Sequence, residues 1–229
     1  MSDVEKGLSS SSNGIIEANR PPNVTVIPRP TRIANPGTLG LFSFASTTFI
    51  LSMYNVQTRG IKAPNVVVGM AIFCGGLTQL LAGMWEFPRG NAFGGTAFSS
   101  YGAFWMSYAT IFIPNSGILD AYGTDASELS SALAVYLFAW MIVTVLFFIT
   151  SLRKSASFIA LFGCLSVTFM LLACSELSAS SGKATISVNL AKSGGAFGII
   201  TAFIAYYVGL SELLASEAKA VTVLPIGAF

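Results

Sequence analysis

The sequence predicts an all-α integral membrane protein that crosses the bilayer with six helices. Of its 229 residues, 53% are hydrophobic and only 10% are charged, whereas a soluble domain carries about 25% charged residues. Six apolar stretches have the length of about 20 residues that a helix needs to cross a hydrocarbon core. Glu212 is the single charged residue inside these stretches, which are residues 38–56, 65–85, 94–113, 130–150, 155–174 and 194–216.

The segments between the apolar stretches carry residues that end helices. Asn35 and Pro36 precede the first stretch and predict a helix start with Asn35 as the N-cap, where free backbone N–H groups favour a carboxylate. The first three connections contain the helix breakers Gly60, Pro64, Pro88, Gly90, Pro114, Gly117 and Gly123. The fourth connection, residues 151–154, is so short that the fourth and fifth helices must be antiparallel neighbours. The fifth, residues 175–193, is rich in serine and leaves room for a short surface helix.

The distribution of Lys and Arg predicts the topology, because these residues are retained on the cytoplasmic side. Six spans place on one side Lys6, Arg20, Arg29, Arg32, Arg89, Arg153, Lys154 and Lys219, and on the other Arg59, Lys62, Lys183 and Lys192. This ratio of eight to four predicts that both termini are cytoplasmic. Residues 1–34 are rich in Ser, Asn and Pro and predict a flexible cytoplasmic tail, followed by a six-helix transmembrane domain over residues 35–229.

The composition excludes several kinds of site. The chain has no histidine, which excludes His-dependent catalytic triads and His-based metal sites. Cys74, Cys164 and Cys174 all lie in apolar stretches without CxxC spacing, which is typical of small core residues. The longest basic run is Arg153-Lys154, so no nucleic-acid partner is expected. We therefore expect neither an enzyme nor a metal or other cofactor.

Small residues recur at helical spacing and predict where helices touch. Lipid gives helices no hydrophobic reason to associate, so small residues mark the faces where two backbones approach closely. The repeats are Gly194, Gly198 and Ala202; Gly69, Gly76 and Gly83; and Ser99, Ala103 and Ser107. The spacing leaves open whether each partner lies in the same chain or in a neighbouring subunit.

Three further stripes follow from helical spacing. Their members are Phe44, Thr48, Ser52 and Asn55; Tyr101, Trp105, Tyr108 and Phe112, with Ser100 nearby; and Phe158, Phe162, Leu165, Phe169 and Leu172. In one interpretation, the first two stripes are packing faces and the third faces lipid. In the other, they form a narrow pathway for a small solute. Such a pathway suits metal cations poorly, because the chain has no acidic residue at mid-span.

The motifs resemble those of the acetate uptake transporter family, which includes the bacterial succinate-acetate permease and fungal acetate and ammonia-related transporters. The segment from Asn35 to Leu41 is similar to the family signature NPAPLGL, with Gly37-Thr38 in place of Ala-Pro. The resemblance continues through residues 69–73, 90–94 and 223–227 and covers Asn35 to Gly227. The departure at residues 37 and 38 removes a proline and predicts a more flexible start to the first helix.

The resemblance implies the function, the assembly and the narrowest point. It implies plasma-membrane uptake of acetate and similar short monocarboxylates by a homo-hexamer embedded in lipid, with one pathway in each protomer. The family's constriction of Phe, Tyr and Leu aligns with Phe44, Tyr101 and Leu165. The third stripe is then better interpreted as partly lining the pathway.

An acetate anion crosses an apolar ring at high cost, so we expect transport of the neutral acid or cotransport of a proton. Asn35, Thr48, Asn55, Gln79 and Ser100 are the expected substrate-binding residues. Glu86 and Glu212, near the ends of spans, are the expected proton-titrating groups. A membrane sensor of acetate or ammonium and an ammonia exporter remain as alternatives.

Overall fold

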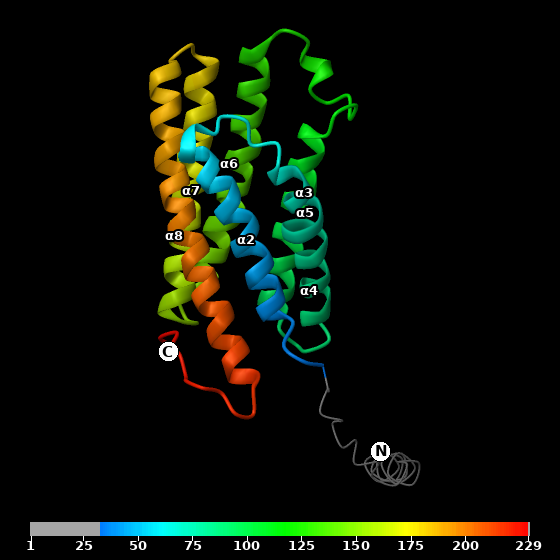
Figure 1. Cartoon of the computed structure of the whole chain (residues 1–229), viewed down its shortest axis with the longest axis vertical. Helices are drawn as coiled ribbons and strands as arrows, with labels where there is room; N and C mark the ends of the chain where they lie inside the picture. Colours follow the sequence, from blue (N-terminus) through cyan, green and yellow to red (C-terminus); the bar gives the residue numbers. More distant parts are fainter. Residues whose placement is uncertain (1–32, 229) are drawn as a thin grey trace, which may run out of the picture. The chain divides into compact units, whose positions relative to one another are not determined.

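The computed structural model describes residues 33–228, and this part of the chain is helical (Figure 1). Five long helices are α2 (Gly37–Asn55), α5 (Ala92–Phe112), α6 (Ala126–Ser151), α7 (Ala156–Ser180) and α8 (Ala184–Ser216). A sixth segment consists of α3 (Val67–Ile72), the π-helix η2 (Phe73–Thr78) and α4 (Gln79–Glu86). Two short 3₁₀ turns, η1 (Thr58–Gly60) and η3 (Asp120–Tyr122), lie in connections. The predicted tail lies almost wholly outside the described residues.

Each predicted apolar stretch coincides with one of these six segments. Four of them are long and apolar enough to cross a membrane, namely Val67–Glu86, Ala126–Ser151, Ala156–Ser180 and Ala184–Ser216. The other two, α2 and α5, contain 19 and 21 residues but are less apolar, because they carry the polar stripes. The all-helical fold is confirmed, and the crossing of all six segments stays a prediction.

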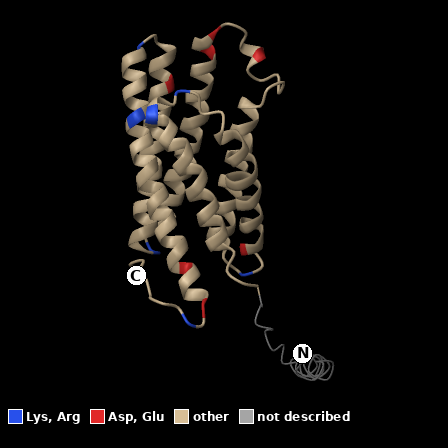
Figure 2. Ribbon diagram, viewed as in Figure 1, with Lys and Arg blue, Asp and Glu red and all other residues tan. Residues whose placement is uncertain are grey.

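Successive helical segments run in alternating directions (Figure 1). The start of α2, the end of α8 and the connections 87–91 and 152–155 all lie at one end of the bundle. Charged residues lie toward the two ends, whereas the middle is almost free of them (Figure 2). Among the described residues, Arg89, Arg153, Lys154 and Lys219 are balanced by the four cations assigned to the opposite side. The predicted cytoplasmic excess therefore depends on the four tail cations, which lie outside the described residues.

The connection between α7 and α8 differs from the prediction. The short surface helix expected within residues 175–193 is wrong, because α7 continues to Ser180 and α8 begins at Ala184. Ser175 shows the reason: its hydroxyl is buried and donates a 2.8 Å hydrogen bond to the carbonyl of Ser187. The serine-rich segment therefore forms the ends of two long helices and the turn between them. The predicted antiparallel pairing of α6 and α7 through a short turn is confirmed.

The small-residue face of α8 packs within the same chain. A Cβ placed on Gly194 would lie 3.0 Å from Leu172 of α7, and one on Gly195 would lie 2.8 Å from the carbonyl oxygen of Ser52 of α2. Ala202, one residue of the predicted repeat, is fully buried. The spacing left open whether this face contacts the same chain or a neighbouring subunit. For α8 the contacts lie within the same chain.

Glycines also bring α4 and α5 together. A Cβ on Gly83 would lie 2.5 Å from the backbone nitrogen of Ser99, and one on Gly102 would lie 2.7 Å from that of Leu80. Gly69, which the spacing placed on the same face as Gly83, instead has open space around it. The π-helix lies between Gly69 and Gly83 and alters the number of residues per turn there. Residues spaced by seven therefore do not stay on one face of the helix.

Substitution by alanine should affect stability in opposite ways at Gly102, which contacts a neighbouring helix, and at Gly69, which does not. Gly102→Ala should lower the free energy of unfolding by about 1–3 kcal/mol, because the added methyl group meets the backbone of Leu80. Gly69→Ala should be neutral or stabilise the helix by up to about 1 kcal/mol, because alanine is the better helix former. Thermal unfolding of the two variants in detergent measures the difference. Equal losses of stability would contradict the packing of α4 against α5.

Candidate functional site

Two cavities follow one another along the bundle and share two wall residues. The first cavity has a volume of about 120 Å³ and lies near the start of α2, where Gly37, Gln79, Glu86 and Glu212 line it. The second cavity has a volume of about 110 Å³, and its lining residues include Thr48, Asn55, Trp105, Leu165 and Glu176. Phe44 and Tyr101 line both cavities. These two rings therefore form the partition between the cavities.

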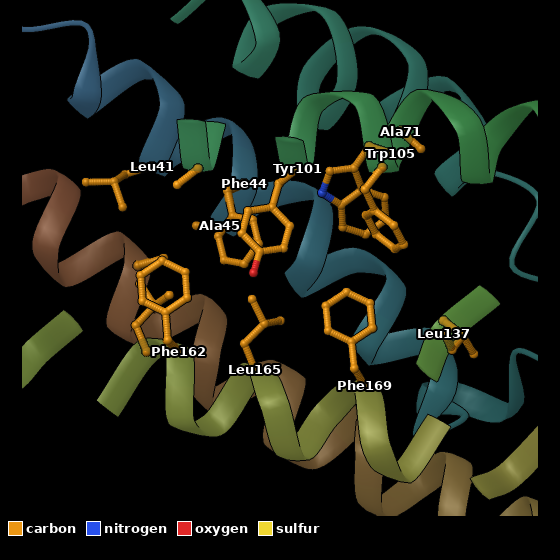
Figure 3. Close-up of a cluster of buried hydrophobic side chains, with 14 of the residues drawn as sticks. Leu41, Phe44, Ala45, Ala71, Tyr101, Trp105, Leu137, Phe162, Leu165 and Phe169 are labelled. Carbon is orange, nitrogen blue, oxygen red and sulfur yellow. The ribbon is translucent and has the colours of Figure 1, made fainter. Parts of the chain in front are cut away.

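The three predicted constriction residues lie together at this partition. The ring centroids of Phe44 and Tyr101 are 5.7 Å apart, and Leu165 of α7 is directed toward these rings (Figure 3). All three side chains are at most 5% exposed. Phe162, one turn before Leu165, stacks on Tyr101 from α7 and lines the first cavity. The interpretation of this α7 stripe as a lipid-facing surface is therefore wrong.

A hydrogen bond fixes the ring of Tyr101. Its hydroxyl lies 2.9 Å from the hydroxyl of Thr144 on α6, which in turn donates to the carbonyl of Trp140 at 2.7 Å. Because the proton of Thr144 is used in that second bond, Tyr101 is the donor in the first. Tyr101 thus presents its ring to the cavities while its proton is occupied. Thr144 was missed because no sequence pattern indicates which side of α6 faces α5.

Buried polar atoms without partners concentrate on the cavity walls. In the described part of the chain these atoms are Thr48 Oγ1, both amide atoms of Gln79, Ser99 Oγ and Trp105 Nε1. Gln79 lines the first cavity, and Thr48 and Trp105 line the second. A buried polar group without a partner is costly, so such groups need an explanation. Hydrogen bonds to a polar ligand in the cavities would satisfy all but the hydroxyl of Ser99.

The other predicted substrate-binding residues divide between the cavities and their surroundings. Asn55 lines the second cavity, together with Thr48. Ser100 lines neither cavity, because the turn of α5 directs Tyr101 to the partition instead. Asn35 also lies outside both cavities, and its side chain takes part in a hydrogen-bond network at the start of α2. Trp105 also lines the second cavity but was not predicted as a binding residue. The signal that could have identified it was its place in the same stripe as Tyr101.

The network at the start of α2 joins three helix ends. Asn35 Oδ1 accepts a hydrogen bond from the backbone N–H of Gly37 at 3.0 Å, but the N-cap is Pro36 rather than the predicted Asn35, because the carbonyl of Pro36 accepts the first helical hydrogen bond, from Gly40. Asn35 Oδ1 also accepts from Arg89 at 2.6 Å, while the amide nitrogen donates to Glu212 Oε2 at 3.0 Å. Asn35 therefore occupies a backbone N–H group that was predicted to be free to bind a carboxylate. Its side chain links α2 to the end of α8.

Glu86 is a buried carboxylate with a charged partner. It is 1% exposed, and Arg89 Nη1 lies 3.1 Å from its Oε2. The side-chain amide of Asn91 donates to the same oxygen at 3.0 Å. Glu86 and Arg89 are three residues apart, at the end of α4 and in the turn that follows. This pair offsets the charge of a carboxylate in the wall of the first cavity.

Gly37 allows both acidic side chains to approach the start of α2. A Cβ at this position would lie 2.8 Å from Glu86 Oε1 and 2.9 Å from Glu212 Oε2. The alanine of the family signature would therefore displace the carboxylates in this arrangement. The neighbouring Thr38 donates its hydroxyl to the carbonyl of Asn35 at 3.2 Å. This bond restores part of the rigidity that the missing proline was expected to remove.

Removal of Arg89 tests the charge balance of the network. Arg89→Leu should lower the free energy of unfolding by about 2 kcal/mol, because Glu86 is left buried without a countercharge and Arg89 itself is 30% exposed. The double variant with Glu86→Gln should recover most of that loss. Thermal unfolding in detergent measures both effects. A single variant as stable as the parent would show that Glu86 does not need this partner.

The chain is similar to several known proteins. A family model described as the GPR1/FUN34/yaaH family matches residues 19–227. The chain is 46% identical over 186 residues to the ammonia transport outward protein 2 of Saccharomyces cerevisiae, which covers 81% of this chain and 64% of the yeast protein. It is 36% identical over 198 residues to the succinate-acetate/proton symporter SatP of Escherichia coli, which covers 86% of this chain and 97% of the bacterial protein.

A solved structure is also similar. The structure of the bacterial acetate channel SatP matches with a TM-score of 0.72 and 33% sequence identity, over 86% of this chain and 100% of that chain. The chain thus spans the whole of the bacterial channel but less than two thirds of the yeast relative. With its four strongly apolar helices, this likeness identifies a multi-pass membrane protein. The resemblance found in the sequence is confirmed, and the chain belongs to the GPR1/FUN34/yaaH family.

Proposed function

We propose that this protein transports acetate and similar short-chain monocarboxylates across the plasma membrane. The observation that carries the proposal is the pair of cavities separated only by Phe44 and Tyr101, with Leu165 beside them. Each cavity is large enough for a few non-hydrogen atoms and has unpartnered polar atoms in its wall. A small carboxylic acid has the size and the hydrogen-bonding groups that such walls accept. The names of the two bacterial relatives support the same substrate.

The partition favours passage of an uncharged species. Phe44, Tyr101, Phe162 and Leu165 surround the narrow point with apolar surface, and moving an unpaired charge there is costly. A proton that travels with the carboxylate removes that cost. We therefore propose proton-linked uptake, as the name of the Escherichia coli relative also indicates for that protein.

The polar residues have distinct roles on this route. Thr48 and Asn55 bind the substrate in the second cavity, and Gln79 binds it in the first. Asn35 supports this site indirectly through Glu212. Glu86 and Glu212, both in the wall of the first cavity, are the titratable groups that lie nearest to the end of the route. Ser100 has no role in the proposal, because it lies outside both cavities.

The proposed assembly is a homo-hexamer of six-span protomers with cytoplasmic termini and no enzymatic activity. Large apolar side chains on one face of the second helical segment are exposed, among them Phe73, Leu81, Met84 and Trp85. Such a face is suited to lipid or to a neighbouring protomer. The transport pathway itself lies inside a single chain, so each protomer would have its own.

Ammonia export is the second candidate. The yeast relative with 46% identity is named for outward ammonia transport, and aromatic and hydroxyl groups also suit a small neutral base. The unpartnered carboxamide of Gln79 and indole N–H of Trp105 suit both solutes, because a carboxylic acid and neutral ammonia each accept a hydrogen bond from Trp105 Nε1. A sensor without transport is the third alternative, and it predicts binding without flux.

Flux measurements test the substrate and the constriction together. Purified protein in proteoliposomes should carry radiolabelled acetate faster than ammonia. Phe44→Ala and Tyr101→Ala should shift the preference toward larger acids such as lactate by about tenfold, because they widen the partition. Tyr101→Phe is the matched control and should keep the parent selectivity, since only the bond to Thr144 is lost. Absence of acetate flux in the parent would leave the sensor or the exporter.

The dependence on pH tests the proton linkage. Acetate uptake into sealed vesicles should rise as the external pH falls, because both the neutral acid and the cotransported proton become more abundant outside. Protein-free vesicles measure the diffusion of acetic acid through lipid, which must be subtracted. Glu212→Gln should retain the pH dependence if the proton travels on the substrate and lose it if this carboxylate relays the proton. Uptake independent of external pH would leave a channel for the anion.

A further inference from the structure

The wall of the first cavity contains a cation that the route described above does not use. Lys154 lies in the turn between α6 and α7 and lines this cavity. Its ammonium nitrogen is 4.4 Å from the ring centroid of Phe93, another wall residue. Phe93 is held in turn by edge-on contacts with Phe158 and Phe162 of α7. The aromatic wall therefore directs the Lys154 side chain along the cavity.

The turn that carries Lys154 is anchored on both sides. The backbone N–H of Lys154 donates to Ser151 at 2.9 Å, and Ser155 caps the start of α7 by accepting from Phe158 N–H at 3.2 Å. The C-terminal segment covers the same turn, because Gly227 accepts from the N–H of Ala156 at 2.8 Å. These bonds hold the backbone of Lys154 at the cavity. Its side chain is exposed but keeps its ammonium group beside the ring of Phe93.

Lys154 determines the net charge of the first cavity. Its charged wall residues are Glu86, Glu212 and Lys154. Glu86 is paired with Arg89, which is the single salt bridge among residues 33–228. Contact with an aromatic ring does not neutralise the ammonium group. Lys154 therefore offsets Glu212, and without it the cavity would carry a net negative charge that repels a carboxylate.

We propose that Lys154 determines the specificity of the first cavity for anions by attracting the substrate carboxylate. A charge focused in a cleft raises the local concentration of the oppositely charged ligand. The carboxylate held near Lys154 lies in the same cavity as the unpartnered carboxamide of Gln79, which can donate a hydrogen bond to it there. This assignment rests on the proposed transport of monocarboxylates and adds a specificity-determining residue to it.

Neutralisation of adjacent cations tests the assignment. Lys154→Gln should weaken acetate binding to the detergent-solubilised protein about tenfold, and in proteoliposomes it should raise the KM for acetate while the maximal rate stays close to that of the parent. Lys154→Arg should retain binding. Arg153→Gln is the matched control, because it removes the same charge from the same turn at a residue that does not line the cavity. The effect of Lys154→Gln should also shrink as salt is raised from 0.01 M to about 0.15 M.

The outcomes separate this assignment from the proposed function. Equal binding by the parent and Lys154→Gln, or equal losses in both neutralised variants, would overturn the assignment. A loss that Lys154→Arg does not rescue, accompanied by a lower unfolding temperature, would also overturn it, because Lys154 would then only support Phe93. Binding that depends on Lys154 in a parent without acetate flux would support the assignment and reject transport.

Discussion

The close approach of helix backbones is the constraint on which the rest of the structure depends. Phe44 and Tyr101 belong to different helices, and their rings meet because glycines bring the surrounding segments together. Gly102 lets α5 approach the backbone of α4, and Gly195 lets α8 approach that of α2. In lipid no hydrophobic force opposes the separation of these helices, so small residues decide how wide the pathway is. The partition is therefore a consequence of how closely the helix backbones pack, including at Gly102, the residue next to Tyr101.

Charged residues lie toward the two ends of the bundle, and the middle is almost free of them (Figure 2). At the start of α2, Asn35 accepts bonds from Arg89 and Gly37 and donates to Glu212, so one amide coordinates three segments. Thr48 and Gln79 lack partners nearer the middle. Asn35, Glu86 and Arg89 thus bind one another's helix ends inside the protein. The neutral groups in the middle remain unsatisfied, as expected where a ligand passes through.

The sequence predicted the helices and several wall residues because helical spacing alone determines which side chains share a face. Phe44, Thr48 and Asn55 were found in this way and do line cavities. Spacing does not determine which faces oppose each other across the bundle, so the bond from Tyr101 to Thr144 and the place of Lys154 could not be predicted. It also assumes a constant helical repeat, which the π-helix interrupts. Gly69 therefore does not lie on the face that the spacing predicted. The position of Ser100 outside both cavities likewise depends on how α5 packs.

The proposed route explains why acidic and basic groups share one cavity. An acid that has crossed Phe44 and Tyr101 in the neutral form reaches the first cavity with a proton that it must lose to water or to a carboxylate. In the proposed route Glu212 is the acceptor for that proton, and Lys154 stabilises the anion left behind. Separation of the proton from the anion disfavours return, because the anion cannot recross the apolar rings at low cost. The mixture of charges at this end therefore lets the proton and the anion separate, while the gradients of acetate and protons set the direction of net movement.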